Sequence, residues 1–173
     1  MASLAGSFRY HEARVLLLID AMTRSGGKVD GLTKIAKLDF LLRYPSFLDQ
    51  LSVARGLSLP LELAPTVSEQ RAVESRMVRY KYGPWDDKYY PVLGRLIGLA
   101  LVDALPGQGR LAVRVTESGR IVSDELRELG WEQTWQRARF LKRNFDRSGS
   151  TLKSIIYEEL PEVVDRPVRS VIP

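Results

Sequence analysis

The sequence predicts a mainly α-helical fold that carries one small β-hairpin. Three observations predict it: apolar residues recur at helical spacing through most of the chain, glycine and proline separate these runs, and two short apolar segments flank one turn-rich tip. The chain has 173 residues, of which 45% are hydrophobic and 27% charged. This composition is typical of a globular domain with its own core.

Apolar residues at helical spacing predict two amphipathic helices at the start of the chain. The first covers residues 10–25 and ends at the glycine pair that begins with Gly26. The second covers residues 32–44 and ends before Pro45, since proline cannot continue the hydrogen-bonding pattern. A third, short helix is expected over residues 46–55.

The middle of the chain predicts a loop, two helices and the turn between them. Residues 56–65 form the loop and residues 68–79 the first helix. Within residues 80–87, glycine is followed by proline, which ends that helix. The second helix covers residues 88–100, and its apolar side faces the core. Its open side holds Lys88, Pro91, Arg95 and Gly98.

A β-hairpin is predicted directly after this second helix. Residues 101–104 and 111–115 are short apolar segments, and the tip between them is rich in glycine and proline. Thr116 is a favourable N-cap for the next helix, which Gly130 ends. The apolar side of that helix is expected to hold Ile121, Val122, Leu126 and Leu129.

Two further helices complete the predicted elements. One carries Trp131 and Trp135 on its apolar side, and the other begins at Ser148 or Ser150 and stops at Pro161. The last thirteen residues contain three prolines, four valines and one isoleucine. Proline prevents a helix there, so this tail is expected to be extended.

The order of the elements over residues 68–116 predicts a winged helix-turn-helix core plus C-terminal helices, because a helix, a tight turn, a second helix and a hairpin follow one another. The chain then divides into a winged helix-turn-helix domain (10–130), a C-terminal helical extension (131–160) and an extended tail (161–173). Such motifs also serve as protein-docking modules, so the order alone leaves DNA contact open.

The composition excludes several kinds of chemistry. The chain has no cysteine, so it has no thiolate zinc site and no thiol nucleophile, and with a single histidine, His11, the usual catalytic triads are not expected. The segment Ser25-Gly26-Gly27-Lys28 is interpreted as a helix-ending turn, because Val29 stands where a phosphate loop needs serine or threonine. Asp86-Asp87 are interpreted as structural residues at a helix start. We therefore expect no enzyme activity, no metal and no cofactor.

The sequence also predicts a cytoplasmic protein. The longest apolar run holds five residues, Val15 to Ile19, which is too short to span a bilayer. Residues 1–9 lack the hydrophobic core of a signal peptide.

The formal net charge of +5 favours anionic partners but does not identify nucleic acid. The excess is uneven, with +3 in residues 1–60, 0 in residues 61–130 and +2 in residues 131–173. If double-stranded DNA is bound, Lys88 and Arg95 are expected in the major groove and Arg110 and Arg114 at the phosphates. Second choices are Lys81, Arg137, Lys142 and Arg143, the last three within a basic cluster that can equally be a solvated helix face.

Two groups of residues are candidates for binding a protein partner. Five aromatic residues fall between positions 80 and 90, and Tyr82, Trp85 and Tyr90 are the candidates among them. In the tail, the candidates are Val163, Val164, Val168 and Ile172, which are expected to pack on a second subunit or a partner protein. Alternatively, the tail folds back over its own helix with Trp131 and Trp135.

Two segments resemble the winged-helix middle components of bacterial ABC three-component conflict systems: residues 33–45 (TKIAKLDFLLRYP) and residues 79–90 (RYKYGPWDDKYY). The continuation through residues 116–120 (TESGR) also resembles the wing and the following helix of MarR-type regulators. The first resemblance, over residues 10–160, implies a non-catalytic adaptor between an ABC-type ATPase and an effector in antiviral or anti-plasmid defence. The alternative is a stand-alone homodimeric DNA-binding transcriptional repressor.

Overall fold

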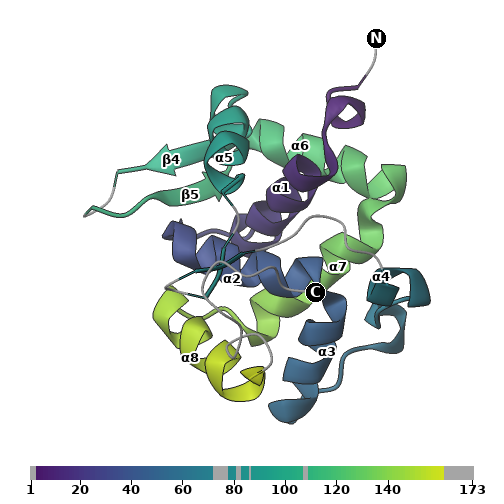
Figure 1. Cartoon of the computed structure of the whole chain (residues 1–173). Helices are drawn as coiled ribbons and strands as arrows, with labels where there is room; N and C mark the ends of the chain where they lie inside the picture. The colour runs from purple at the N-terminus through teal and green to yellow at the C-terminus, as the bar shows by residue number, and fades with distance from the viewer. Residues whose placement is uncertain (1–2, 72–77, 81–82, 86, 107–108, 162–173) are drawn as a thin grey trace.

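A computed structural model describes residues 3–71, 78–80, 83–85, 87–106 and 109–161 (Figure 1). The helices are α1 (Tyr10–Thr23), α2 (Leu32–Arg43), α3 (Pro45–Ala54), α4 (Val67–Arg71), α5 (Tyr89–Gly98), α6 (Glu117–Leu126), α7 (Glu132–Asn144) and α8 (Gly149–Glu159). The strands are β1 (Val29–Asp30), β2 (Val78–Tyr80), β3 (Gly83–Trp85), β4 (Val102–Leu105) and β5 (Ala112–Val115). The mainly helical fold with a small hairpin is confirmed.

Three strands form a small antiparallel sheet in the order β1-β5-β4. The predicted hairpin is confirmed as β4 and β5, with Val102 opposite Val115. The other edge strand, β1, pairs Val29 with Val113. The sequence analysis missed β1 because a strand of two residues shows no alternation of apolar and polar positions.

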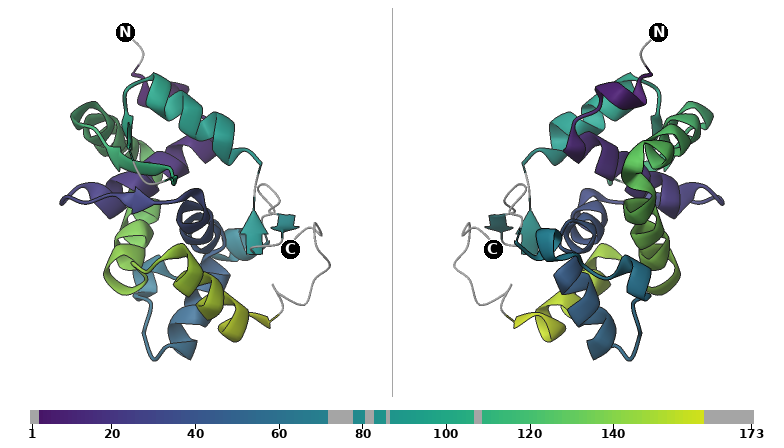
Figure 2. Two further views of the ribbon diagram at one scale, coloured as in Figure 1. Left: turned by 90° about the vertical axis from the view of Figure 1, so that its left-hand side faces the viewer. Right: turned by 90° about the vertical axis from the view of Figure 1, so that its right-hand side faces the viewer.

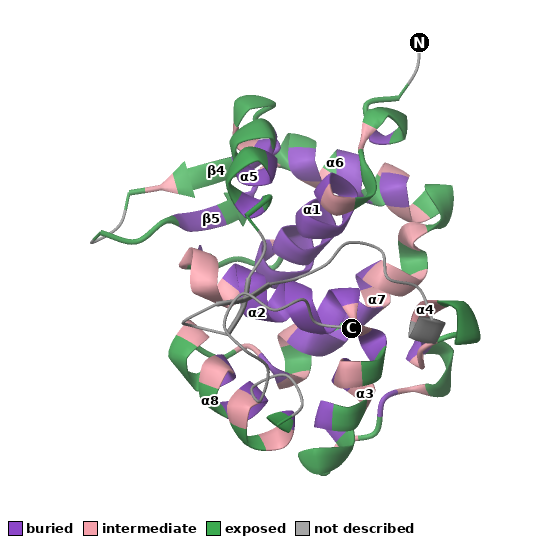
Figure 3. Cartoon of the chain, in the orientation of Figure 1, coloured by how far each residue is buried: buried purple, intermediate pink, exposed green. Residues whose placement is uncertain are grey.

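Helix α1 lies at the centre of the molecule and contacts α2, α5, α6, α7 and β5. Its residues from Glu12 to Thr23 are all buried (Figure 3). The glycine pair after it has positive φ angles, 112° at Gly26 and 86° at Gly27, which confirms the helix-ending turn. In side view, α5 and the hairpin lie at one end of the molecule, and α8 lies at the other (Figure 2).

The helix predicted over residues 68–79 is confirmed at its start and wrong at its end. Residues 67–71 form α4, residues 72–77 lie outside the described part of the chain, and residues 78–80 form a strand that pairs with β3, with Val78 opposite Trp85. Valine and tyrosine favour strands, and Gly83 begins the return strand. Helix α5 therefore does not follow a helix in a tight turn; it packs on α1.

The predicted helices after the hairpin are confirmed, with one difference in which side is buried. Thr116 caps α6 by accepting a hydrogen bond from the Gly119 N–H at 3.0 Å. Val122 and Leu126 are buried, but Ile121 and Leu129 are 53% and 60% exposed. The chain turns at Gly130, where φ is 107°, and this kink leaves Leu129 outside the core.

The C-terminal helices share one continuous core with the rest of the chain. Trp135 and Leu141 of α7 and Leu152 of α8 are buried in the same cluster as the α1 side chains. Ser148 caps α8 by accepting a hydrogen bond from the Thr151 N–H at 3.2 Å. Of the two predicted starts of this helix, Ser148 and Ser150, the first is therefore confirmed. Residues 131–160 thus pack as part of the main body, against α1 and α2.

Candidate functional site

Helix α5 presents the open side that the sequence predicted. Tyr89, Leu93 and Leu96 are buried, and the four positions predicted for the open side, Lys88, Pro91, Arg95 and Gly98, are exposed. Pro91 is tolerated because it lies in the first turn of the helix. The hairpin of β4 and β5 follows α5 directly and lies beside it (Figure 1).

A buried polar cluster fixes α5 on α1 and α2. Arg14 of α1 donates from Nε and Nη2 to the two carboxylate oxygens of Asp39 in α2, at 2.7 and 3.1 Å. The hydroxyl of Tyr89 in α5 donates to the same carboxylate. All three side chains are at most 2% exposed. Because two donors from different helices meet one acceptor, the cluster sets the rotation of α5.

The electrostatics of this cluster follow from its burial. Burial alone would raise the pKa of Asp39, but the Arg14 guanidinium and the Tyr89 hydroxyl outweigh it and hold the pKa below its usual value. Burial, followed by the Asp39 carboxylate, raises the pKa of Tyr89 well above its usual value. Asp39 is therefore ionised and Tyr89 protonated near neutral pH.

His11 belongs to the same cluster. Its Nδ1 atom lies 2.6 Å from Nη2 of Arg14, and it accepts because a guanidinium can only donate. Its ring centre is 5.5 Å from that of Tyr89. Sequence reasoning did not single out Arg14 or Asp39. Each is a charged residue inside an apolar helical stretch, and this pattern could have identified them.

Arg95 and Arg114, which were predicted to meet DNA, are paired within the protein. Arg95 lies 3.4 Å from the Glu12 carboxylate and packs over the ring of Phe8. Arg114 lies 3.6 Å from Asp103 on the neighbouring strand. Lys88 and Arg110 are exposed. The exposed side of α5 together with the hairpin of β4 and β5, called here the α5–wing face, therefore has less uncompensated positive charge than the sequence suggested.

The prediction that Arg137 binds phosphate is wrong, because this side chain is only 2% exposed. Its guanidinium donates to the carbonyl oxygens of Leu63 and Ala64 at 2.9 and 3.0 Å and pairs with Glu69 at 2.7 Å. Arg137 thus holds the loop before α4 against α7. In the same basic cluster, Lys142 pairs with Asp146 at 2.7 Å, and Arg143 is exposed.

Several predicted site residues lie outside the described part of the chain. These are Lys81, Tyr82, Val163, Val164, Val168, Ile172 and the side chain of Trp85. Tyr90 is described, and its side chain is 66% exposed. Of the three aromatic candidates for partner binding, Tyr90 is therefore the one whose side chain the structure describes.

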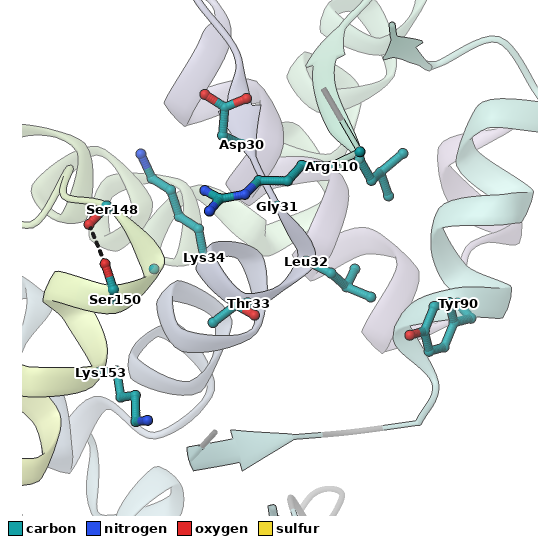
Figure 4. A pocket seen from close by; sticks show the side chains of 13 residues that line it. Asp30, Gly31, Leu32, Thr33, Lys34, Tyr90, Arg110, Ser148, Ser150 and Lys153 are labelled. Carbon is teal, nitrogen blue, oxygen red and sulfur yellow. Dashed lines mark hydrogen bonds between the residues drawn. The ribbon is translucent and has the colours of Figure 1, made fainter. Parts of the chain in front are cut away.

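A pocket of about 650 Å³ opens beside Tyr90, between the starts of α2 and α8 and the tip of the hairpin (Figure 4). Its cations are Lys34, Arg110 and Lys153, its hydroxyl groups are those of Thr33, Ser148 and Ser150, and its apolar side chains are Leu32 and Leu111. Sequence reasoning singled out Arg110 and Tyr90 but could not bring these segments together, since they are far apart in the chain.

No family model, curated protein or solved structure matches the chain. Among the residues that the structure describes, no three His, Cys, Asp or Glu side chains gather as they would around a metal ion. In the same residues, no helix is long and apolar enough to cross a membrane.

Proposed function

We propose that the chain is a winged-helix, non-catalytic adaptor that works with an ABC-type ATPase and an effector in a bacterial defence system. The observation that carries the fold assignment is the sheet order β1-β5-β4. A winged helix has the order helix, strand, helix, helix, strand, strand, and in its sheet the last strand lies between the first two. The elements α1, β1, α2, α5, β4 and β5 follow this plan, with α3, α4, β2 and β3 inserted before α5.

In this assignment α5 is the helix that a DNA-binding winged helix places in the major groove, and residues 101–116 are the wing. The assignment differs from the one that the sequence suggested, because the partner helices of α5 are α1 and α2 rather than residues 68–79. The buried contact from Asp39 in α2 to Tyr89 in α5 supports it, since it joins helices that are separated by the insertion.

The charges on the α5–wing face favour a protein adaptor over a stand-alone repressor. A repressor needs cations that are free to neutralise phosphates and side chains that read base edges. Arg95 and Arg114 are paired with carboxylates of the protein itself. The exposed side of α5 also contains Pro91, Gly94 and Gly98, which offer no side-chain hydrogen bonds to a base.

The resemblance of residues 33–45 and 79–90 to the middle components of ABC three-component conflict systems supports the identity of the partners. Residues 33–45 cover most of α2, including Asp39, and residues 79–90 lead into α5. The same resemblance implies a linker without catalytic residues.

A gel-shift titration with the full chain at two salt concentrations separates the adaptor from the repressor. The probe is a set of duplexes that tile the region upstream of the chain's own gene. The adaptor predicts no sequence-specific shift at either salt concentration. A specific shift that weakens steeply with salt, and that Lys88→Ala reduces, would support the repressor and contradict the adaptor.

A further inference from the structure

A second hollow lies where α3 and α7 end beside α8. Its volume is about 310 Å³, and Arg55, Arg143 and Arg147 line it, with no carboxylate on the described lining. We propose that this hollow binds the phosphate group of a small molecule, either inorganic phosphate or a phosphate monoester. Helix α8 lies at the end of the molecule away from α5 and the hairpin (Figure 2), so the proposal does not depend on the α5–wing face or on the protein partners proposed above.

Positive charge gathers at this hollow. Arg143 and Arg147 are exposed, and within the part of the chain that the structure describes neither side chain makes an ion pair or a hydrogen bond. Arg55 lies 3.6 Å from the Glu159 carboxylate. Among the described residues, one carboxylate therefore faces three cations, and this excess of positive charge favours an anionic ligand.

Asp146 lies between Arg143 and Arg147 in the sequence, but two lysines share its charge. Its carboxylate oxygens lie 2.6 Å from Lys34 and 2.7 Å from Lys142. Burial alone would raise the pKa of Asp146, but the two ammonium groups outweigh it and lower the pKa. Asp146 is thus ionised and paired with the lysines, and no ion pair joins it to the arginines within the described residues.

The two helix ends at the hollow do not account for its arginines. A helix C-terminus attracts cations because its last carbonyl groups lack partners in the helix. Here the backbone supplies partners: the Leu57 N–H donates to the Ser52 carbonyl at 2.8 Å, and the Phe145 N–H donates to the Leu141 carbonyl at 2.7 Å. Arg147 lies beyond the last residue of α7. No side chain of the three arginines donates to a carbonyl group of the described residues, so all three guanidinium groups can donate to a ligand.

The size and chemistry of the hollow favour a phosphate group. A guanidinium group matches phosphate oxygens with two parallel N–H···O bonds. A phosphate monoester carries about −1.5 to −2 charges at pH 7, which balances two guanidinium groups. The volume of about 310 Å³ is at the lower end of the range for small-molecule sites, roughly 300–1,000 Å³. Its apolar residues Phe145 and Ile155 are 2% and 7% exposed, so they offer little surface to a peptide side chain.

A titration followed by the backbone amide resonances of the ¹⁵N-labelled full chain tests the proposal. The probes are inorganic phosphate and O-phosphoserine, with sodium chloride at the same ionic strength as reference. We expect saturable shifts of residues 55–57, 143–147 and 155. Tighter binding of O-phosphoserine would identify a monoester as the source of the phosphate group, and equal or tighter binding of inorganic phosphate would identify the free ion; either result supports the proposal.

Three results would overturn it. The first is that the shifts fail to saturate or that chloride reproduces them. The second is that they fall elsewhere in the chain. The third is that a glutamate-rich peptide or a short DNA duplex binds the same residues more tightly than both phosphate probes, since the hollow would then serve a macromolecule.

Matched variants locate the site. Arg143→Ala and Arg147→Ala are each expected to weaken phosphate binding about tenfold, the effect of losing one charge-assisted hydrogen bond. Arg139→Ala removes the same charge from the exposed surface of α7, outside the hollow, and it should leave the affinity unchanged. If Arg139→Ala weakens binding as much as Arg143→Ala, the binding is unspecific attraction and the proposal fails. Unchanged melting temperatures without phosphate show that the variants are folded.

Discussion

Asp39 joins three helices that are far apart in the sequence, because its carboxylate accepts from Arg14 in α1 and from Tyr89 in α5. An ionised group with no exposed surface is tolerated only when it is paired and hydrogen-bonded. The sequence could not reveal this pairing, since Arg14 and Asp39 are separated by 25 positions. What it could show was the apolar stripe of α5, which predicted that Tyr89 is buried.

Asp39→Asn should destabilise the protein by about 3–5 kcal/mol, because it leaves the buried Arg14 guanidinium without its counter-charge. Tyr89→Phe should cost less, about 1.5–3 kcal/mol, because it removes one hydrogen bond to a charged group. Urea denaturation measures both. Tyr90→Phe is the control, since that side chain is exposed, and it should be nearly neutral. A loss for Tyr90→Phe equal to that for Tyr89→Phe would contradict the structure.

The lowered pKa of Lys37 predicts that the protein becomes more stable at alkaline pH. Its pKa is lowered to about 8, while the unfolded chain has the ordinary value of about 10.4. Between these values the unfolded state binds more protons, so the free energy of unfolding should rise with pH. Lys37→Met should raise this free energy at pH 7 by about 1–3 kcal/mol and remove the rise. Denaturation at pH 7 and pH 9 measures this free energy, and Lys28→Met is the control because Lys28 is half-exposed. A rise that persists in Lys37→Met would show that another group is responsible.

At the scale of elements, the sequence predicted those whose signal is local. The stripes of α5, α7 and α8, the N-caps Thr116 and Ser148, and the hairpin of β4 and β5 all follow from short-range patterns. Strand β2 has three residues and pairs with β3, whereas β1 has two residues and is defined only by its pairing with the distant strand β5. For the same reason, the sequence could not assemble the pocket between the wing, α2 and α8.

Gly119 sets how closely α6 approaches the start of β4. An added Cβ atom would lie 2.0 Å from the carbonyl oxygen of Leu101, and backbone cannot move aside as a side chain can. Gly119→Ala should therefore lower the melting temperature by several degrees, in line with overpacking costs of about 1–3 kcal/mol. Gly94→Ala is the matched control on α5, because nothing lies within 4 Å of its Cβ position. It should be neutral or slightly stabilising, and the opposite ranking of the two variants would contradict the packing of α6.

On the scale of the whole molecule, one continuous core joins the proposed winged helix to its C-terminal helices. Arg137 shows that cations close together in sequence need not share one face, because its own side chain lies inside the protein. The tail after Pro161 lies outside the described residues, so its role remains a prediction from its apolar composition.

Deleting residues 162–173 should weaken assembly without unfolding the protein, because the apolar tail is expected to pack on a second subunit or a partner protein. We expect a lower mass in light scattering, or loss of partner capture, with a melting temperature close to that of the full chain. A large fall in melting temperature with unchanged assembly would instead make the tail part of the chain's own core.

The central claim is that the chain acts as an adaptor to an ATPase rather than through DNA. Affinity purification of the tagged full chain from its native host, after nuclease treatment, followed by mass spectrometry, tests it most directly. The account predicts that an ABC-type ATPase co-purifies at near-equal amounts and remains bound once nucleic acid is removed. Recovery of the chain alone, as a homodimer that retains only its own promoter DNA before nuclease treatment, would contradict it.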